Sequence, residues 1–262
     1  PEITQLRRAE SGPRSRRAPM ARLPRLPDLL TTANLACGVS SILFASQGQL
    51  TTACWLVFAG AFFDVLDGLA ARALGGGTPL GAQLDSLADM VTFGVAPAFA
   101  VFKAGHYFLA QEGTQPWAFI LGCIALVIAS AWRLAKFNID TRQTSGFLGL
   151  PTPANGLFWV SVVLAHVALA GSEQGGASWF SFGWFPGAVP IIALVTSSLM
   201  LSELPLPSLK FKHFKWKGNE VIFLLIGIGS VLVILYGIRA VPMILLLYLL
   251  SPLWGKVFPK TT

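Results

Sequence analysis

Four of the chain's 12 acidic residues are aspartates that fall close together, inside two stretches that are otherwise apolar. Asp64 and Asp67 lie three positions apart in one stretch, and Asp85 and Asp89 lie four positions apart in the next. Spacings of three and four place side chains on one face of a helix. We therefore expect each pair to project from a single helical face, and the two faces to oppose each other across a short turn.

Carboxylates in apolar surroundings need a compensating partner. One carboxylate at the centre of a bilayer costs about 2.5–3.5 kcal/mol on insertion scales, and repulsion between neighbours adds to that cost. Oxygen-rich clusters of this kind suit hard divalent cations. The four aspartates therefore predict a Mg²⁺ or Mn²⁺ site at which chemistry takes place.

Small residues and one arginine accompany the carboxylates. Gly68 and Ala71 share a helical face with the first pair, Gly81 lies one turn before the second pair, and Arg72 ends the first stretch. Small residues leave room for a bulky group against the backbone, although they also serve close helix packing. Because a guanidinium pairs well with phosphate, the combination favours a site for a nucleotide diphosphate.

The composition indicates that a bilayer surrounds these stretches. Of the 262 residues, 54% are hydrophobic and only 12% are charged, with a mean hydropathy of +0.65. Soluble domains carry about 25% charged residues, and a spanning helix needs roughly 20 apolar ones. We predict an all-α integral membrane protein with about eight spans, at residues 29–47, 50–74, 81–104, 117–138, 152–171, 186–204, 219–238 and 240–255.

Basic residues predict the orientation of these spans. All but two of the 19 Lys and Arg residues, Lys103 and Arg239, fall at the ends of the chain or in loops on one side. Basic residues gather on the cytoplasmic side, so we expect a multi-pass protein of the inner cell membrane with both termini and the aspartates facing the cytoplasm. Residues 1–28 are expected to form a basic segment at the membrane surface, and no nucleic-acid partner is expected.

The chemical residues form one continuous pattern: Asp64-Val-Leu-Asp67-Gly68-Leu-Ala-Ala71-Arg72, eight residues, Gly81, three residues, Asp85, three residues and Asp89. This pattern resembles the signature of the CDP-alcohol phosphatidyltransferase family at every defining position. Three further runs, Gly81–Pro97, Arg133–Asn138 and Phe147–Pro153, resemble the phosphatidylserine synthase branch of that family. The resemblance carries motifs over roughly residues 28–160.

The resemblance implies an architecture and a reaction. A six-helix membrane core over residues 29–204 would be followed, in residues 205–262, by a basic loop and two further spans, commonly in a homodimer. The enzyme would transfer the phosphatidyl group of CDP-diacylglycerol to L-serine and release CMP. Two Mg²⁺ or Mn²⁺ ions would be held by Asp64, Asp67, Asp85 and Asp89, and Asp89 would also take the proton of the serine hydroxyl.

The resemblance also implies residues for the two substrates. The CDP-lipid would contact Gly68, Ala71, Arg72, Thr78 and Gly81, and also Asn34, although many relatives have a Pro-Asn pair where this chain has Ala33-Asn34. By its position at the cytoplasmic end of the fourth expected span, level with the aspartates, Arg133 is expected to bind the serine carboxylate rather than serve only as a basic residue at a helix end, with Lys136 and Asn138 completing the acceptor site. The alternative for Lys136 is the basic collar usual at a cytoplasmic helix end.

Two alternatives stay open. A sibling transferase would use glycerol phosphate or inositol phosphate as acceptor, and such an acceptor would need several cations around a second anion. A cation transporter would need acidic residues that continue across the bilayer, whereas here they stop at one level of two otherwise apolar stretches. We therefore favour the enzyme, with serine as acceptor.

Overall fold

The computed structural model describes residues 25–112, 117–139, 147–170, 185–206, 220–237 and 240–257. Within these ranges the chain is helical, apart from one pair of two-residue strands and the connecting turns. The helical class predicted from hydropathy is confirmed for this part of the chain, and the strand pair was not predicted. The basic segment at residues 1–28 and the basic loop after residue 205 lie largely outside the described residues.

The apolar stretches form helices close to the predicted positions. The third stretch is continuous but changes register within its length: α4 (Pro79–Asp89) leads into the π-helical η1 (Met90–Val95) and then α5 (Ala96–Glu112). The others are α2 (Leu26–Ser46), α3 (Leu50–Ala73), α6 (Trp117–Ile139), α7 (Thr152–Ala170), α8 (Phe185–Leu201), α9 (Glu220–Tyr236) and α10 (Ala240–Val257). Among the described residues, α2, α3, the stretch Pro79–Gly105 and α6 are long and apolar enough to cross a membrane, and α7 to α10 contain shorter apolar helices. The total of eight spans stays a prediction.

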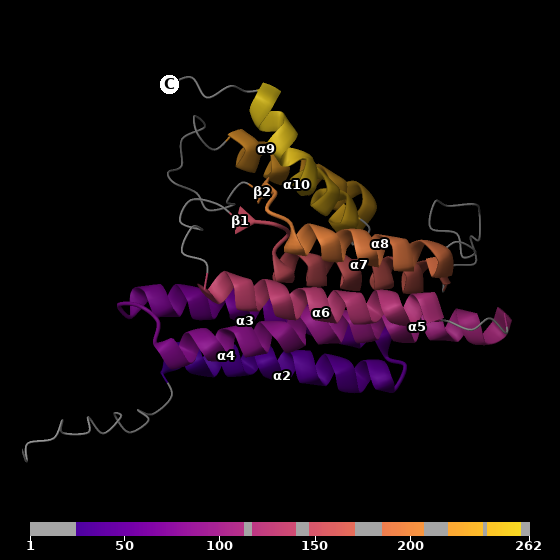
Figure 1. Cartoon of the computed structure of the whole chain (residues 1–262), viewed down its shortest axis with the longest axis horizontal. Coiled ribbons are helices and arrows are strands. Elements are labelled where there is room, and N and C mark those ends of the chain that lie inside the picture. Colours follow the sequence, from indigo (N-terminus) through magenta and orange to yellow (C-terminus); the bar gives the residue numbers. More distant parts are fainter. Residues whose placement is uncertain are drawn as a thin grey trace, which may run out of the picture.

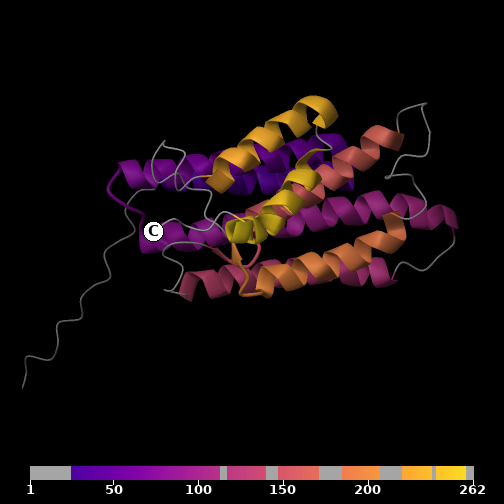
Figure 2. The same ribbon diagram turned by 90° about the horizontal axis from the view of Figure 1, so that it is seen from above.

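The helices are arranged in layers. Figure 1 shows α2 to α6 lying side by side along the longest axis, with α7 and α8 next to them and α9 and α10 beyond. Figure 2, the view from above, shows α9 and α10 inclined to the long helices. The core between the layers includes Phe93 of η1, Phe119 of α6 and Trp159 of α7, all buried.

Large apolar side chains cover the outside of the helices. Phe62, Trp132, Ile191 and Ile234 are among many that are exposed. Extended apolar surface is unusual on a soluble monomer, but in a bilayer the surrounding hydrocarbon is as apolar as these side chains. The apolar helices therefore indicate a membrane-embedded protein.

Close packing of α2 and α3 against η1 fixes the orientation of the third stretch. A Cβ added to Gly38 would overlap the Thr92 hydroxyl, and one added to Gly60 would lie 2.5 Å from Cγ2 of Thr92. The hydroxyl of Thr92 also donates to the carbonyl oxygen of Asn34 at 3.0 Å. Because η1 begins directly after Asp89, this packing determines how that carboxylate faces α2.

A short strap, residues 147–151, leads from α6 into α7. Its first part, β1 (Phe147–Leu148), pairs antiparallel with β2 (Pro205–Leu206), which follows α8. Gly149 has a φ of +75°, and a Cβ there would lie 2.6 Å from the carbonyl oxygen of Ser202. Only glycine fits that backbone and that contact. The strap therefore holds the start of α7 in place against the end of α8.

Candidate active site

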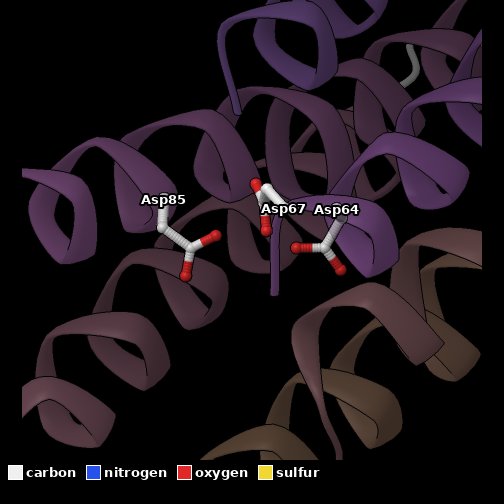
Figure 3. Close-up of side chains that lie close together, drawn as sticks. All are labelled: Asp64, Asp67 and Asp85. Carbon is white, nitrogen blue, oxygen red and sulfur yellow. The ribbon is translucent and has the colours of Figure 1, made fainter. Parts of the chain in front are cut away.

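Three carboxylates converge where α3 ends and α4 begins. Figure 3 shows the side chains of Asp64, Asp67 and Asp85 turned toward a common space. One oxygen atom of each lies within 4.8 Å of the others. The only ion pair found among the described residues lies elsewhere, between Lys136 and Glu203. A set of carboxylate oxygens without a basic partner fits a hard divalent cation such as Mg²⁺ or Mn²⁺.

The turn between α3 and α4 brings these faces together. It contains Gly75 and Gly76, whose φ angles are +86° and +111°, a backbone region that glycine adopts readily. Helix α4 starts at Pro79, two residues earlier than expected, and Thr78 caps it by accepting a hydrogen bond from the amide of Gly81 at 2.9 Å. Thr78 and Gly81 therefore lie together at the start of α4.

The small residues predicted to leave room for a nucleotide differ in their surroundings. A Cβ added to Gly81 would lie 3.0 Å from Oδ1 of Asp28 and close to the Thr78 hydroxyl, so that position is already filled. The nearest atom to a Cβ on Gly68 is Nη1 of Arg72, at 3.6 Å. Arg72 is exposed and Ala71 is half-buried. Of the two glycines, Gly68 is therefore the less closely packed, with only the end of the Arg72 side chain near it.

Asp89 lies at the inner edge of the carboxylate cluster. It is 8% exposed, and its carboxyl group contacts that of Asp64. On the other side, Nδ2 of Asn34 donates a hydrogen bond to Oδ1 of Asp89 at 3.2 Å. The structure thus brings all four predicted aspartates together. Of the two on α4, Asp89 is buried and Asp85 is half-buried.

Helix α2 supplies two of the groups that hold this cluster. Besides Asn34, which is fully buried, Thr31 donates a hydrogen bond from its hydroxyl to Oδ2 of Asp67 at 2.7 Å. Asn34 was expected to contact the nucleotide, whereas no role was predicted for Thr31. The signal that was available is the three-residue spacing of two polar residues in an apolar helix, which places both on one face.

Arg133, predicted to bind the acceptor, is buried on α6. It is 6% exposed, and its Nε donates to the carbonyl oxygen of Leu150 in the strap at 2.7 Å. Its guanidinium carbon lies 5.6 Å from the centre of the Phe137 ring. Its Nη2 is buried and finds no hydrogen-bond partner among the described residues. Tyr248 and Asp89 are both near enough to interact with the guanidinium electrostatically.

The other two residues predicted for the acceptor lie further out and have partners. Nζ of Lys136 lies 3.4 Å from Oε1 of Glu203, and these side chains are 43% and 60% exposed. Nδ2 of Asn138 donates to the hydroxyl of Ser86 at 2.9 Å. Asn138 therefore ties the end of α6 to α4 beside the carboxylates, whereas Lys136 ties it to the segment after α8.

Two residues at the start of α7 were not predicted. Thr152 is fully buried and Asn155 is 2% exposed. Within the described part of the chain, Oγ1 of Thr152 and Oδ1 of Asn155 have no hydrogen-bond partner. The signal was again a pair of polar residues three positions apart in an apolar stretch.

Comparisons with known proteins agree with this chemistry. A family model described as CDP-alcohol phosphatidyltransferase matches residues 25–199. A CDP-diacylglycerol–serine O-phosphatidyltransferase of Helicobacter pylori is 33% identical over 238 residues, which cover 88% of this chain and 91% of that protein. One of Bacillus subtilis is 32% identical over 195 residues, 74% of this chain and 94% of that protein. An archaetidylserine synthase of Methanothermobacter thermautotrophicus is 33% identical over 186 residues, 70% and 69% of the two chains.

Proposed function

The chain belongs to the CDP-alcohol phosphatidyltransferase family, and we propose that it transfers the phosphatidyl group of CDP-diacylglycerol to L-serine, giving phosphatidylserine and CMP. It is a membrane-embedded transferase of phospholipid biosynthesis. The observation that carries the proposal is the convergence of Asp64, Asp67 and Asp85, with Asp89 against them. Relatives named for the serine reaction match most of the chain.

Asp64, Asp67 and Asp85 are the residues that would hold the divalent ions, two in our proposal, with Asp89 at the edge. When bound, Mg²⁺ or Mn²⁺ would neutralise negative charge on the pyrophosphate of the CDP-lipid. We assign the CDP-lipid to the end of α3 and the start of α4, through Gly68, Ala71, Arg72 and Thr78, with Gly81 holding the Thr78 hydroxyl by its backbone amide. The exposed guanidinium of Arg72, whose Nη1 is the nearest atom to a Cβ added to Gly68, supports this assignment.

Asp89 acts as the general base in the proposed reaction. It accepts the proton of the serine hydroxyl as that oxygen attacks the phosphorus that carries the diacylglycerol. The bond from this phosphorus to the oxygen of CMP breaks, and CMP leaves with the bonding electrons. The hydrogen bond from Asn34 holds the Asp89 carboxylate in one orientation during the transfer. A positioned base of this kind contributes about 10²–10⁴ to a rate.

Arg133 binds the serine carboxylate in the proposed reaction. A buried charge is costly unless it is paired, and Nη2 of Arg133 has no partner within the described residues. The carboxylate of the acceptor supplies a negative charge and the missing hydrogen-bond partner. Lys136 is paired with the exposed Glu203. A phosphorylated acceptor, which wants several cations, therefore fits this end of α6 less well than serine does.

The position of the protein in the membrane is part of the proposal. The distribution of basic residues supports eight spans with both termini and the active site on the cytoplasmic side of the inner membrane. The family resemblance supports a homodimer. Labelling of single introduced cysteines from either side of sealed vesicles checks the orientation.

A transferase assay tests the proposed function. The purified protein is given CDP-diacylglycerol with serine, glycerol phosphate or inositol phosphate in separate reactions, with release of CMP as the readout. We expect product with serine, loss of activity in excess chelator, and recovery with Mg²⁺ or Mn²⁺. Product with only a phosphorylated alcohol would favour the sibling reaction. Cation uptake into vesicles, without release of CMP, would favour the transporter.

The substitution Arg133→Lys tests the acceptor assignment. Lysine keeps the charge but cannot reproduce the planar fork of arginine. We expect the KM for serine to rise about ten- to a hundredfold, the range for one hydrogen bond to a charged group, with little change for CDP-diacylglycerol. Serine amide should be a poor substrate for the unmodified enzyme, and the variant should discriminate little against it. An equal loss for both substrates would mean that Arg133 holds the nucleotide or the fold.

A further inference from the structure

Three buried polar atoms near the start of α7 lack a hydrogen-bond partner among the described residues. They are Nη2 of Arg133, Oγ1 of Thr152 and Oδ1 of Asn155. The three residues are 6%, 0% and 2% exposed. Most buried polar groups in proteins are paired, and each exception calls for an explanation. A partner from outside the chain would account for all three.

The backbone brings these atoms to one region. Arg133 donates from Nε to the carbonyl oxygen of Leu150 at 2.7 Å, and Leu150 precedes Thr152 by two residues in the strap. Thr152 and Asn155 lie three positions apart at the start of α7, and hence on one face of it. The carbonyl group that Arg133 bonds is therefore two residues from Thr152, where this helical face begins.

The same region borders the general base. A Cβ added to Gly156 would lie 2.8 Å from the backbone of Phe93, so the start of α7 packs directly on η1. The first residue of η1 follows Asp89, and Asp89 is within electrostatic range of Arg133. A small acceptor held between α6 and α7 would thus lie next to the carboxylate that must take its proton.

The chemistry of the three atoms is complementary. An arginine Nη2 only donates hydrogen bonds, so its ligand must present an acceptor. An amide oxygen only accepts, so its ligand must present an N–H or O–H donor. An amino acid offers both, a carboxylate and an ammonium group, while its hydroxyl is left for Asp89. A glycerol or inositol phosphate offers no ammonium group.

We propose that Arg133, Thr152 and Asn155 together recognise both charged groups of the amino acid acceptor. Arg133 binds the carboxylate, Oδ1 of Asn155 accepts from the ammonium group, and the Thr152 hydroxyl accepts a second ammonium hydrogen. This inference rests on the proposed function and assigns α7 as the element that selects for the amine. A site built to pair a polar group rejects an analogue that lacks it, because the site's buried atoms are then left unpaired.

Two serine analogues test the proposal with the full-length enzyme in CDP-diacylglycerol micelles. 3-Hydroxypropionate lacks the ammonium group, and ethanolamine lacks the carboxylate. For each enzyme, kcat/KM is measured for serine and for both analogues, and the ratios to serine are compared. Because a ratio does not depend on how much protein is folded, it stays informative for a variant that expresses poorly.

The variant Asn155→Leu has nearly the same shape but no hydrogen-bonding atoms. We expect its preference for serine over 3-hydroxypropionate to fall about ten- to a hundredfold, with its preference over ethanolamine kept. Arg133→Lys should show the reverse pattern. Thr152→Val should lose less, about three- to tenfold, of the preference over 3-hydroxypropionate, the range for one ordinary hydrogen bond.

Ser161→Ala is the matched control. Ser161 is fully buried on the same helix, but its hydroxyl bonds the carbonyl oxygen of Phe158 at 2.6 Å. Both ratios should stay as in the unmodified enzyme.

The outcomes separate this inference from the proposed function. If the unmodified enzyme uses serine and Asn155→Leu keeps its preference over 3-hydroxypropionate, α7 does not read the amine and the inference is wrong, while the proposed function stands. Loss of the preference over ethanolamine in Asn155→Leu also overturns it, since Asn155 would then bind the carboxylate. If the unmodified enzyme does not use serine, both the proposed function and the inference about α7 are wrong.

Discussion

The start of α2 and the start of α7 contain the same polar spacing, Thr-x-x-Asn, but differ in the hydrogen bonds that these residues make. In α2, Thr31 donates to Asp67 and Asn34 donates to Asp89, at 2.7 and 3.2 Å. Both of these hydrogen bonds join α2 to a carboxylate of the cluster. The α2 pair therefore belongs to the machinery that holds the aspartates in place.

In α7, Thr152 and Asn155 are as deeply buried as the α2 pair. Their oxygen atoms nevertheless remain without partners in the part of the chain that the structure describes. The two helices therefore differ in where their buried polar groups find hydrogen-bond partners. Thr31 and Nδ2 of Asn34 donate to carboxylates inside the chain, although Oδ1 of Asn34 also lacks a hydrogen-bond partner among the described residues. In our proposal, the unpaired oxygen atoms of Thr152 and Asn155 bind the acceptor.

The largest expected effect lies on the α2 side of this comparison. Asp64→Asn keeps the shape of the side chain but removes one charge from the metal-binding set. We expect kcat to fall by at least about 10³, on the scale of losing a principal electrostatic group of an active site. The loss should be equal for serine and for ethanolamine, as measured by release of CMP. A fall in kcat with only one of the two acceptors would mean that Asp64 also selects the acceptor, which contradicts the proposed difference between the α2 and α7 regions.

Asp89→Asn tests the general base. The amide cannot accept the serine proton, so we expect kcat to fall by about 10²–10⁴. The KM for CDP-diacylglycerol should change little, because Asp89 lies at the edge of the cluster next to Asn34. If the variant turns over like the unmodified enzyme, another group takes the proton.

Asn34→Leu separates two interpretations of a buried amide. If Asn34 positions Asp89, kcat should fall about tenfold, the lower limit for losing a hydrogen bond to a charged group, while both KM values stay constant. If Asn34 contacts the nucleotide, as the family resemblance implies, the KM for CDP-diacylglycerol should rise instead. Steady-state kinetics with either substrate varied distinguishes them.

The smallest expected effect concerns stability rather than rate. Removing one partner of a buried hydrogen bond to a charge costs roughly 1–3 kcal/mol, whereas replacing an unpaired polar group by an apolar one of the same shape is nearly neutral or stabilising. Without substrates, Thr31→Val should therefore lower the Tm by a few degrees, and Thr152→Val should leave it unchanged or raise it. Thermal unfolding in detergent measures both variants against Ser161→Ala. The reverse order would contradict the comparison.

Much of the candidate site follows from local spacing. Asp64 and Asp67 share one face of α3 and Asp85 and Asp89 share one face of α4, because a helix repeats about every 3.6 residues. The short glycine-containing turn then makes the two helices neighbours. Helix positions follow from hydropathy in the same way, since each apolar stretch must satisfy its backbone internally in a membrane.

Which of the two basic residues at the end of α6 is buried depends on tertiary contacts. Arg133 and Lys136 lie three positions apart at the end of one helix, and both fit a basic collar. The strap directs the carbonyl of Leu150 toward Arg133, while Glu203 holds Lys136 at the exposed side. The strap is itself ordered by pairing with residues that follow α8. No local pattern in α6 contains that information.

The helices, the converging carboxylates and the family follow from the amino-acid sequence alone, because each depends on residue types at short, regular spacing. Which polar residues find hydrogen-bond partners depends on the tertiary fold. Thr31 and Asn34 meet carboxylates from α3 and α4, because the small residues Gly38 and Gly60 let η1 pack closely against α2 and α3. Thr152 and Asn155, at the same spacing, face a region whose charge comes from Arg133. A hydrogen bond needs its partner within about 3 Å, and that distance is set by the packing of helices far apart in sequence.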